Sequence, residues 1–138
     1  MILGIGTDIT EIRHFQDVIQ KTPRLLERVF CLSELENAKK TSVNKQLSFF
    51  AKRFAAKEAI SKACGTGIGA DISWQDIEIF NDSKGAPYVV LSPKVLSFLR
   101  QKFSVLHPEI LLSLSDESSY VVAFAILIEK NKKNTGQF

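Results

Sequence analysis

The sequence predicts an α+β fold in which an antiparallel sheet packs against helices, and three observations support this. The chain has 138 residues, 45% hydrophobic and 24% charged, as expected for one globular domain with about one core. Its predicted elements run in the order strand, several helices, hairpin, helix, hairpin. The late strands are joined by short turns, which favours antiparallel pairing over a doubly wound sheet. We therefore expect a single domain over residues 1–130, followed by a polar tail over 131–138.

A strand over residues 2–9, rich in Ile, Leu and Gly, opens the chain and ends at Asp8. A helical pattern of apolar residues follows from Thr10. Pro23 interrupts this helix and is a good first residue for the next one, over 24–30. The N-terminal region is therefore predicted to be a strand followed by two short helices.

The middle of the chain predicts two further helices. Ser33-Glu34-Leu35-Glu36 is typical of a capping box, with Ser33 as the cap of a short helix. The longest helix should run over residues 45–63, because its alanines favour helix and its apolar residues share one face. The segment from Gly65 to Gly69 then ends it.

The C-terminal half predicts two hairpins with a helix between them. Residues 77–80 and 88–91 are β-rich and flank a polar loop. Ser92-Pro93 begins a helix. The final strands should cover residues 110–115 and 120–128, joined by a polar turn.

Several classes of protein are excluded by composition. Cys31 and Cys64 form no CxxC pair, which argues against a zinc ribbon or a disulfide scaffold and favours two reduced thiols. Two histidines cannot build a His-rich metal site, so a metal here would be hard and held by oxygen. The longest apolar run, residues 120–128, is too short to cross a bilayer, and no signal peptide is present. We expect a soluble, cytoplasmic protein.

Basic residues concentrate in one segment. Residues 39–62 hold seven Lys or Arg residues against one acid, Glu58. Such a segment favours an anionic partner, although a solvated helix face has the same pattern. The glycines that follow lack the spacing of a phosphate-binding loop and fit a helix stop better. Basic residues at 53, 57 and 62 would still let a phosphate lie alongside the helix.

Asp8 and Glu58 are the candidate chemical groups. If the first strand packs on the long helix, their carboxylates could converge, and a carboxylate pair beside phosphate oxygens is a usual Mg²⁺ site. Structural alternatives remain open for both residues. Glu58 could simply pair with Lys62 one helical turn on, and Asp8 could cap a helix.

Three motifs resemble those of the holo-acyl-carrier-protein synthases, the small bacterial-type 4′-phosphopantetheinyl transferases. They are Gly4-Ile5-Gly6-Thr7-Asp8-Ile9, then Arg53-Phe54-Ala55-Ala56-Lys57-Glu58-Ala59 with Lys62, and Gly65-Thr66-Gly67-Ile68-Gly69. The resemblance covers roughly residues 2–129. It implies transfer of phosphopantetheine from coenzyme A to a serine of apo acyl carrier protein, for fatty acid biosynthesis, with Mg²⁺ on the pyrophosphate. It also implies a homotrimer with active sites between subunits, and no nucleic-acid or membrane partner.

The resemblance also assigns roles to residues. Asp8 and Glu58 match the metal ligands and, with Lys62, the reacting centre. The residues that match coenzyme-binding positions are Lys45, Arg53, Lys62, Gly65, Gly85 and Pro87. The candidates for docking an acidic carrier protein are Arg13, His14, Lys21, Arg24 and Arg28.

One position departs from the family pattern. A histidine usually follows the Ser-x-Ser/Thr motif of the penultimate strand, but here Ser113-Leu114-Ser115 is followed by Asp116. We interpret Asp116 mainly as a turn former. Two alternative functions fit the sequence less well. In a non-enzymatic binding module, the basic helix would dock nucleic acid or an acidic protein, but the chain lacks the interleaved aromatic and basic strand pattern of RNA-binding sheets and any zinc-finger spacing. The transferases dedicated to polyketide or peptide synthetases are usually about twice as long, so the length counts against that class.

Overall fold

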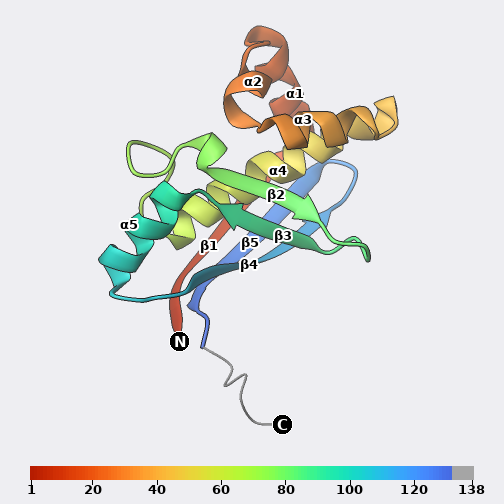
Figure 1. Ribbon diagram of the computed structural model, residues 1–138. Coiled ribbons are helices and arrows are strands. Elements are labelled where there is room, and N and C mark those ends of the chain that lie inside the picture. Colours follow the sequence, from red (N-terminus) through yellow and green to blue (C-terminus); the bar gives the residue numbers. More distant parts are fainter. Residues whose placement is uncertain (132–138) are drawn as a thin grey trace.

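The computed structural model describes residues 1–131, and Figure 1 shows the arrangement of their helices and strands. The elements are β1 (Ile2–Glu11), α1 (Ile12–Lys21), α2 (Leu25–Val29), α3 (Leu32–Lys39), α4 (Val43–Ala63), a 3₁₀ turn η1 (Trp74–Asp76), β2 (Ile77–Asn81), β3 (Pro87–Leu91), α5 (Pro93–Phe103), β4 (Pro108–Asp116) and β5 (Tyr120–Glu129). This is the expected α+β order. The polar tail was predicted over residues 131–138, and all of these except Asn131 lie outside the described part of the chain.

The strands form two antiparallel sheets where one was expected. β1, β5 and β4 form a three-stranded sheet in that order, while β2 and β3 pair only with each other. Figure 1 shows the long helix α4 lying between the hairpin and the three-stranded sheet. Buried residues from α4, β2 and β5 meet in one core cluster. Helix α4 therefore lies at the centre of the molecule, and it carries residues of both parts of the candidate functional site described below.

The close contact between α4 and β1 requires glycine at two positions of β1. A Cβ atom added to Gly6 would lie 2.0 Å from the carbonyl oxygen of Ala59, and one on Gly4 would lie 1.9 Å from that of Ala63. Both alanines are themselves buried, so the helix backbone rests directly on the strand backbone. This approach places Glu58, next to Ala59, beside the strand that carries Asp8.

Two boundaries differ from the sequence predictions. β1 continues to Glu11, because Thr10 and Glu11 still pair with Val121 and Tyr120 of β5, so Asp8 lies within the strand and not at its end. Helix α3 begins one residue after Cys31, not after Ser33. The Glu34 carboxylate reaches back to the Cys31 N–H at 2.9 Å and completes a capping box there.

A second apolar cluster joins α1, α2 and α3 to the N-terminal half of α4. Its fully or nearly buried members include Phe15, Val29, Phe30 and Phe50. Phe30 and Phe50 pack with their ring centroids 4.8 Å apart. The three short helices thus form a cap on one end of α4 (Figure 1). Within residues 1–131, no helix is both long and apolar enough to span a bilayer.

Candidate functional site

Asp8, Lys62 and Glu58 meet at the contact between β1 and α4. Lys62 Nζ lies 3.2 Å from Asp8 Oδ1 and also donates to the Thr7 carbonyl oxygen at 3.0 Å. The other Asp8 oxygen accepts a hydrogen bond from Thr10 at 3.0 Å. The Asp8 side chain is 17% exposed, so it is held in place at the edge of the core. Lys62 pairs with Asp8 and not with Glu58, so the simple helical pair considered for Glu58 is not formed.

The pKa of Glu58 is raised, first by burial, then by the negative charge of Asp8, while Lys62 acts in the opposite direction. Asp8 and Glu58 are therefore close enough to repel each other. A pair of repelling carboxylates that remains partly open to solvent fits a divalent cation, whose charge would relieve the repulsion. Among the described residues, no group of three or more His, Cys, Asp or Glu side chains could hold a metal. A cation here would take its other ligands from substrate and water.

A cavity of about 510 Å³ lies on another side of α4. Four predicted coenzyme-binding residues line it, namely Lys45, Arg53, Gly85 and Pro87. The remaining lining residues were not predicted from the sequence to bind a ligand. They are Thr41, Ser48, Phe49, Lys52, Asn81, Leu114 and Asp116. The lining residues of α4 between positions 45 and 52 are three or four residues apart, which places them on one face of the helix. This helical spacing from Lys45 could have identified them in the sequence.

Arg53 is a buried cation in the wall of this cavity. It is 4% exposed, its guanidinium stacks 3.7 Å from the centroid of the Phe49 ring, and it donates to Asn81 Oδ1 at 2.7 Å. Its Nε atom is buried and has no hydrogen-bond partner within the part of the chain that the structure describes. A buried guanidinium with unused donors suits an anionic group such as phosphate.

Asp116 is the single acid in the lining of this cavity. One of its carboxylate oxygens lies 3.3 Å from Lys52 Nζ, and the other accepts a hydrogen bond from Ser48 at 3.4 Å. Asp116 is the last residue of β4, at the start of the turn to β5. It therefore combines the expected turn position with an unexpected ion pair inside the cavity.

The predicted site residues fall into two groups. Lys62 and Gly65 lie at the C-terminal end of α4 and do not line the cavity around Arg53. Arg53 and Glu58 are five residues apart, about 140° around the helix axis. Arg53 faces Asn81 of β2, whereas Glu58 faces Asp8 of β1. The structure thus brings Lys45, Arg53, Gly85 and Pro87 together around the cavity and Asp8, Glu58 and Lys62 together on a different flank of α4, whereas Gly65 follows the end of the helix beside Lys102.

One expectation about the basic segment was wrong. Lys57 was expected to project from the helix with Arg53 and Lys62, where a phosphate could lie alongside. It is fully buried against Glu34 instead. Arg53 is nearly buried as well, although it lines the cavity, so of the three only Lys62 projects as expected. The candidate docking residues, by contrast, all have exposed side chains on α1, on α2 or immediately before α2: they are Arg13, His14, Lys21, Arg24 and Arg28.

Comparisons with known proteins agree on one family. The model of the 4′-phosphopantetheinyl transferase superfamily matches residues 4–125. The chain is 43% identical over 130 residues to a holo-[acyl-carrier-protein] synthase of Pelagibacter ubique, covering 94% of this chain and 98% of that protein. It is 45% identical over 130 residues to the protein of that name from Zymomonas mobilis, covering 92% and 96%.

Solved structures give the same result. The holo-[acyl-carrier-protein] synthase of Neisseria meningitidis superposes with a TM-score of 0.82 at 35% identity, covering 93% of this chain and 99% of that one. The synthase of Bacillus anthracis, solved in complex with CoA (3′,5′-ADP), has a TM-score of 0.76 at 36% identity, covering 92% and 96%. The similarity therefore spans nearly the whole fold, including both groups of site residues.

Proposed function

The chain belongs to the 4′-phosphopantetheinyl transferase superfamily, and on this premise we propose that it is a holo-[acyl-carrier-protein] synthase. It transfers 4′-phosphopantetheine from coenzyme A to a serine of apo acyl carrier protein, and adenosine 3′,5′-bisphosphate is the other product. The observation that carries the proposal is that Asp8, Glu58 and Lys62 lie together where glycines of β1 allow the strand to contact α4 closely. Fatty acid biosynthesis is the pathway that such a carrier protein serves.

In this reaction the serine oxygen forms a bond to the β-phosphorus of the coenzyme, and the bond from that phosphorus to the bridging oxygen breaks. The serine proton is lost, and the bisphosphate leaves with the bridging oxygen. Asp8 and Glu58 would hold Mg²⁺, which would neutralise charge on the pyrophosphate when bound. Lys62 is half exposed beside Asp8, so its ammonium can reach the same phosphates.

The cavity around Arg53 would bind the nucleotide end of coenzyme A. Lys45, Lys52 and Arg53 place three cations around it, against one carboxylate from Asp116. Gly85 of the β2–β3 loop and Pro87, the first residue of β3, also line the cavity. An adenosine carrying a 3′-phosphate matches this excess of positive charge.

The direct test is incubation with coenzyme A, Mg²⁺ and apo acyl carrier protein, followed by mass spectrometry of the carrier. The carrier should gain one phosphopantetheine group, and chelation of the metal should prevent the gain. A carrier of unchanged mass would refute the proposal and favour a binding module without transferase activity. We place the enzyme in the cytoplasm, where its two cysteines, both free, would stay reduced.

We propose further that the active site forms between subunits of a homotrimer. The two groups of site residues lie on different flanks of α4, so a second copy would bring the cavity of one chain to the carboxylates of another. The sheet face away from α4 is also apolar and exposed. Its side chains, each at least 40% exposed, are Ile5, Ile9, Leu111, Tyr120, Val122 and Phe124. Exposed apolar area of this kind is typical of an interface.

We expect light scattering at micromolar concentration to give about three times 15.4 kDa. Phe124→Glu should dissociate the assembly, because three buried carboxylates would lie in the apolar contact. Gln101→Glu, at an exposed position on α5 and outside this sheet face, is the control and should leave the assembly intact. A fully active monomer would contradict the shared site.

Carrier docking should depend on charge at the α1 and α2 surface. Reversing Arg13, Arg24 or Arg28 to Glu is expected to raise the KM for the carrier severalfold more than the KM for coenzyme A, because exposed charges steer docking of an acidic partner. Added salt should weaken carrier binding in the unaltered enzyme. Lys130→Glu, an exposed reversal at the far end of β5, should leave both values unchanged. Equal effects of the Arg changes on both substrates would place them outside the docking surface.

Asp116→Asn should retain most of the activity. Asn forms the same turn, and the partly exposed pair with Lys52 is worth little in stability. Loss of the carboxylate also removes repulsion of the coenzyme phosphates, so the KM for coenzyme A should fall or stay the same. Asp116→His should likewise be active. A fall of a hundredfold or more in kcat for Asp116→Asn, with the fold unchanged, would show that this carboxylate takes part in the chemistry.

A further inference from the structure

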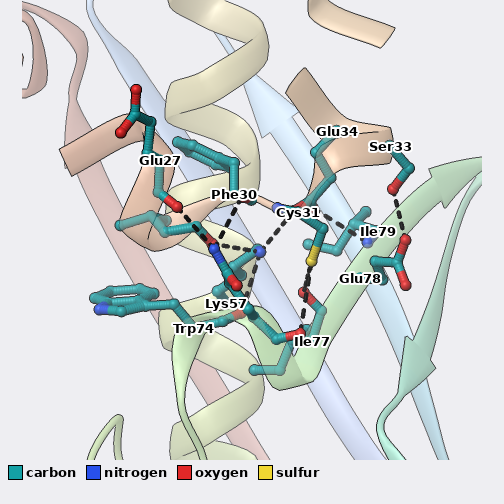
Figure 2. Close-up of polar contacts among 12 residues, drawn as sticks. Glu27, Phe30, Cys31, Ser33, Glu34, Lys57, Trp74, Ile77, Glu78 and Ile79 are labelled. Carbon is teal, nitrogen blue, oxygen red and sulfur yellow. Dashed lines mark hydrogen bonds and ion pairs between the residues drawn. The ribbon is translucent and has the colours of Figure 1, made fainter. Parts of the chain in front are cut away.

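A fully buried ion pair joins α4 to α3, outside both groups of site residues (Figure 2). Lys57 Nζ lies 2.6 Å from Glu34 Oε1, and both side chains have no exposed surface. Lys57 also donates to the carbonyl oxygens of Val29 at 2.7 Å and Trp74 at 3.1 Å. Its three ammonium protons therefore all have acceptors. The end of α2, the start of α3 and the turn η1 are tied to one atom of α4.

The carboxylate of Glu34 ties a strand to the same point. Its Oε1 accepts from the Cys31 N–H at 2.9 Å, and its Oε2 accepts from the Ile79 N–H at 3.2 Å. Ile79 lies in β2, so this second bond fixes the backbone of β2 against α3 and, through Lys57, against α4. Figure 2 shows Glu34 between Lys57 and the green strand.

These contacts close a ring that includes Arg53. Ile79 precedes Asn81 by two residues on β2, and Asn81 Oδ1 accepts the 2.7 Å hydrogen bond from Arg53. Arg53 precedes Lys57 by one turn of α4. The ring thus runs from Arg53 to Asn81, along β2 to the Ile79 N–H, through Glu34 to Lys57, and back along the helix.

Stability alone is a weak explanation for the pair. Exchanging a buried ion pair for apolar residues is often neutral or stabilising, because desolvation offsets the attraction. A pair whose oxygens and protons are all used does, however, fix its neighbours in one geometry. Glu34 also acts on Arg53 through its charge. Burial lowers the pKa of Arg53, and the nearby Glu34 carboxylate opposes that change.

We propose that Glu34 and Lys57 are positioning residues for Arg53. They hold β2 at a fixed distance from α4, so that Asn81 orients the Arg53 guanidinium towards a phosphate in the cavity. The inference rests on the proposed function only in taking that phosphate from the adenosine 3′,5′-bisphosphate part of coenzyme A.

Glu34→Gln is the selective test. The amide oxygen can still accept from Lys57 and Cys31, but the amide NH₂ then faces the Ile79 N–H, donor against donor. Ser33→Ala is the matched control. It removes the 2.5 Å bond from Ser33 to Glu78 of β2, which also links α3 to β2 but lies outside the ring. Both variants are made in the unaltered chain and in an Arg53→Met background.

Calorimetric titration with adenosine 3′,5′-bisphosphate gives a readout independent of turnover. Glu34→Gln should weaken binding about tenfold, as expected for one misplaced charge-assisted hydrogen bond. In the Arg53→Met background the same change should have less than about a twofold effect, because the positioned group is gone. Ser33→Ala should have no effect in either background.

Unchanged affinity in Glu34→Gln, or an equal loss in the Arg53→Met background, would overturn the inference. If Glu34→Gln does not fold, Asn81→Ala cuts the same ring at an exposed residue, and the same two outcomes decide. Failure of the unaltered protein to bind the bisphosphate would refute the proposed function. Binding by the unaltered protein together with either overturning result would refute the inference alone.

Discussion

Asp8→Asn and Glu58→Gln are each expected to lower phosphopantetheine transfer by roughly a thousandfold or more, about 4 kcal/mol in the barrier. Each change keeps the size of the side chain and removes the charge that would hold Mg²⁺. The fold should survive, because the pair between Asp8 and the half-exposed Lys62 contributes at most about 1 kcal/mol. Transfer is measured by mass spectrometry of the carrier, and folding by circular dichroism.

Glu11→Gln is the matched control for these variants, since Glu11 is an exposed carboxylate on the same strand. It should keep full activity. The raised pKa of Glu58 adds a pH dependence: as pH falls through that pKa, protons compete with the cation, and the Mg²⁺ concentration needed for half-maximal rate should rise. Near-normal Mg²⁺-dependent turnover in Asp8→Asn or Glu58→Gln would contradict the assignment of metal ligands.

Gly6→Ala is expected to destabilise the protein by at least about 3 kcal/mol, more than most single substitutions. The new Cβ would lie 2.0 Å from the Ala59 carbonyl oxygen and 2.7 Å from the Ala63 nitrogen, and both are backbone atoms of a central helix. Relief requires α4 to move away from β1, which also separates Glu58 from Asp8. Activity should therefore fall with stability. Urea unfolding measures the first effect.

Gly69→Ala provides the comparison, because a Cβ there meets no atom within 4 Å. Its free energy of unfolding should stay within about 0.5 kcal/mol of the unaltered chain. An unfolding midpoint for Gly6→Ala equal to that of Gly69→Ala would show that α4 and β1 separate easily, and would remove the structural basis for the carboxylate pair.

Elements with a strong local pattern were predictable from the sequence. The long helix, both hairpins and the helix after Ser92 follow from periodicity and turn residues. That helix begins at Pro93 as expected, and the Ser92 hydroxyl accepts a hydrogen bond from the Val95 N–H. The true end of β1 was not predictable, because pairing of Thr10 with Val121, far along the chain, decides it. The separation of β2 and β3 into their own sheet is likewise a matter of tertiary packing.

The arrangement of the candidate site could be predicted only for residues that lie in motifs resembling those of the family. Asp8, Glu58 and Lys62 do converge, and the structure places Lys45 and Arg53 around one cavity. Lys57 could not be placed in this way. It lies in a run of basic residues that indicates a charged surface, and only its buried partner 23 positions earlier reverses that interpretation. Contacts between distant segments are invisible to spacing and composition.

The pairing of β1 with β5 has a consequence for synthesis and folding. β5 is the central strand of its sheet, and the 108 residues from 12 to 119 separate it from β1. At ~5–20 residues per second, the ribosome exposes β1 for roughly 5–20 s before its hydrogen-bonding partner exists. During that interval α4, with a smaller contribution from α1, can shield the strand. Because this pairing joins segments so far apart in sequence, we expect closing of the sheet to be the slow step of folding and an unpaired, apolar β1 to be the segment from which aggregation begins.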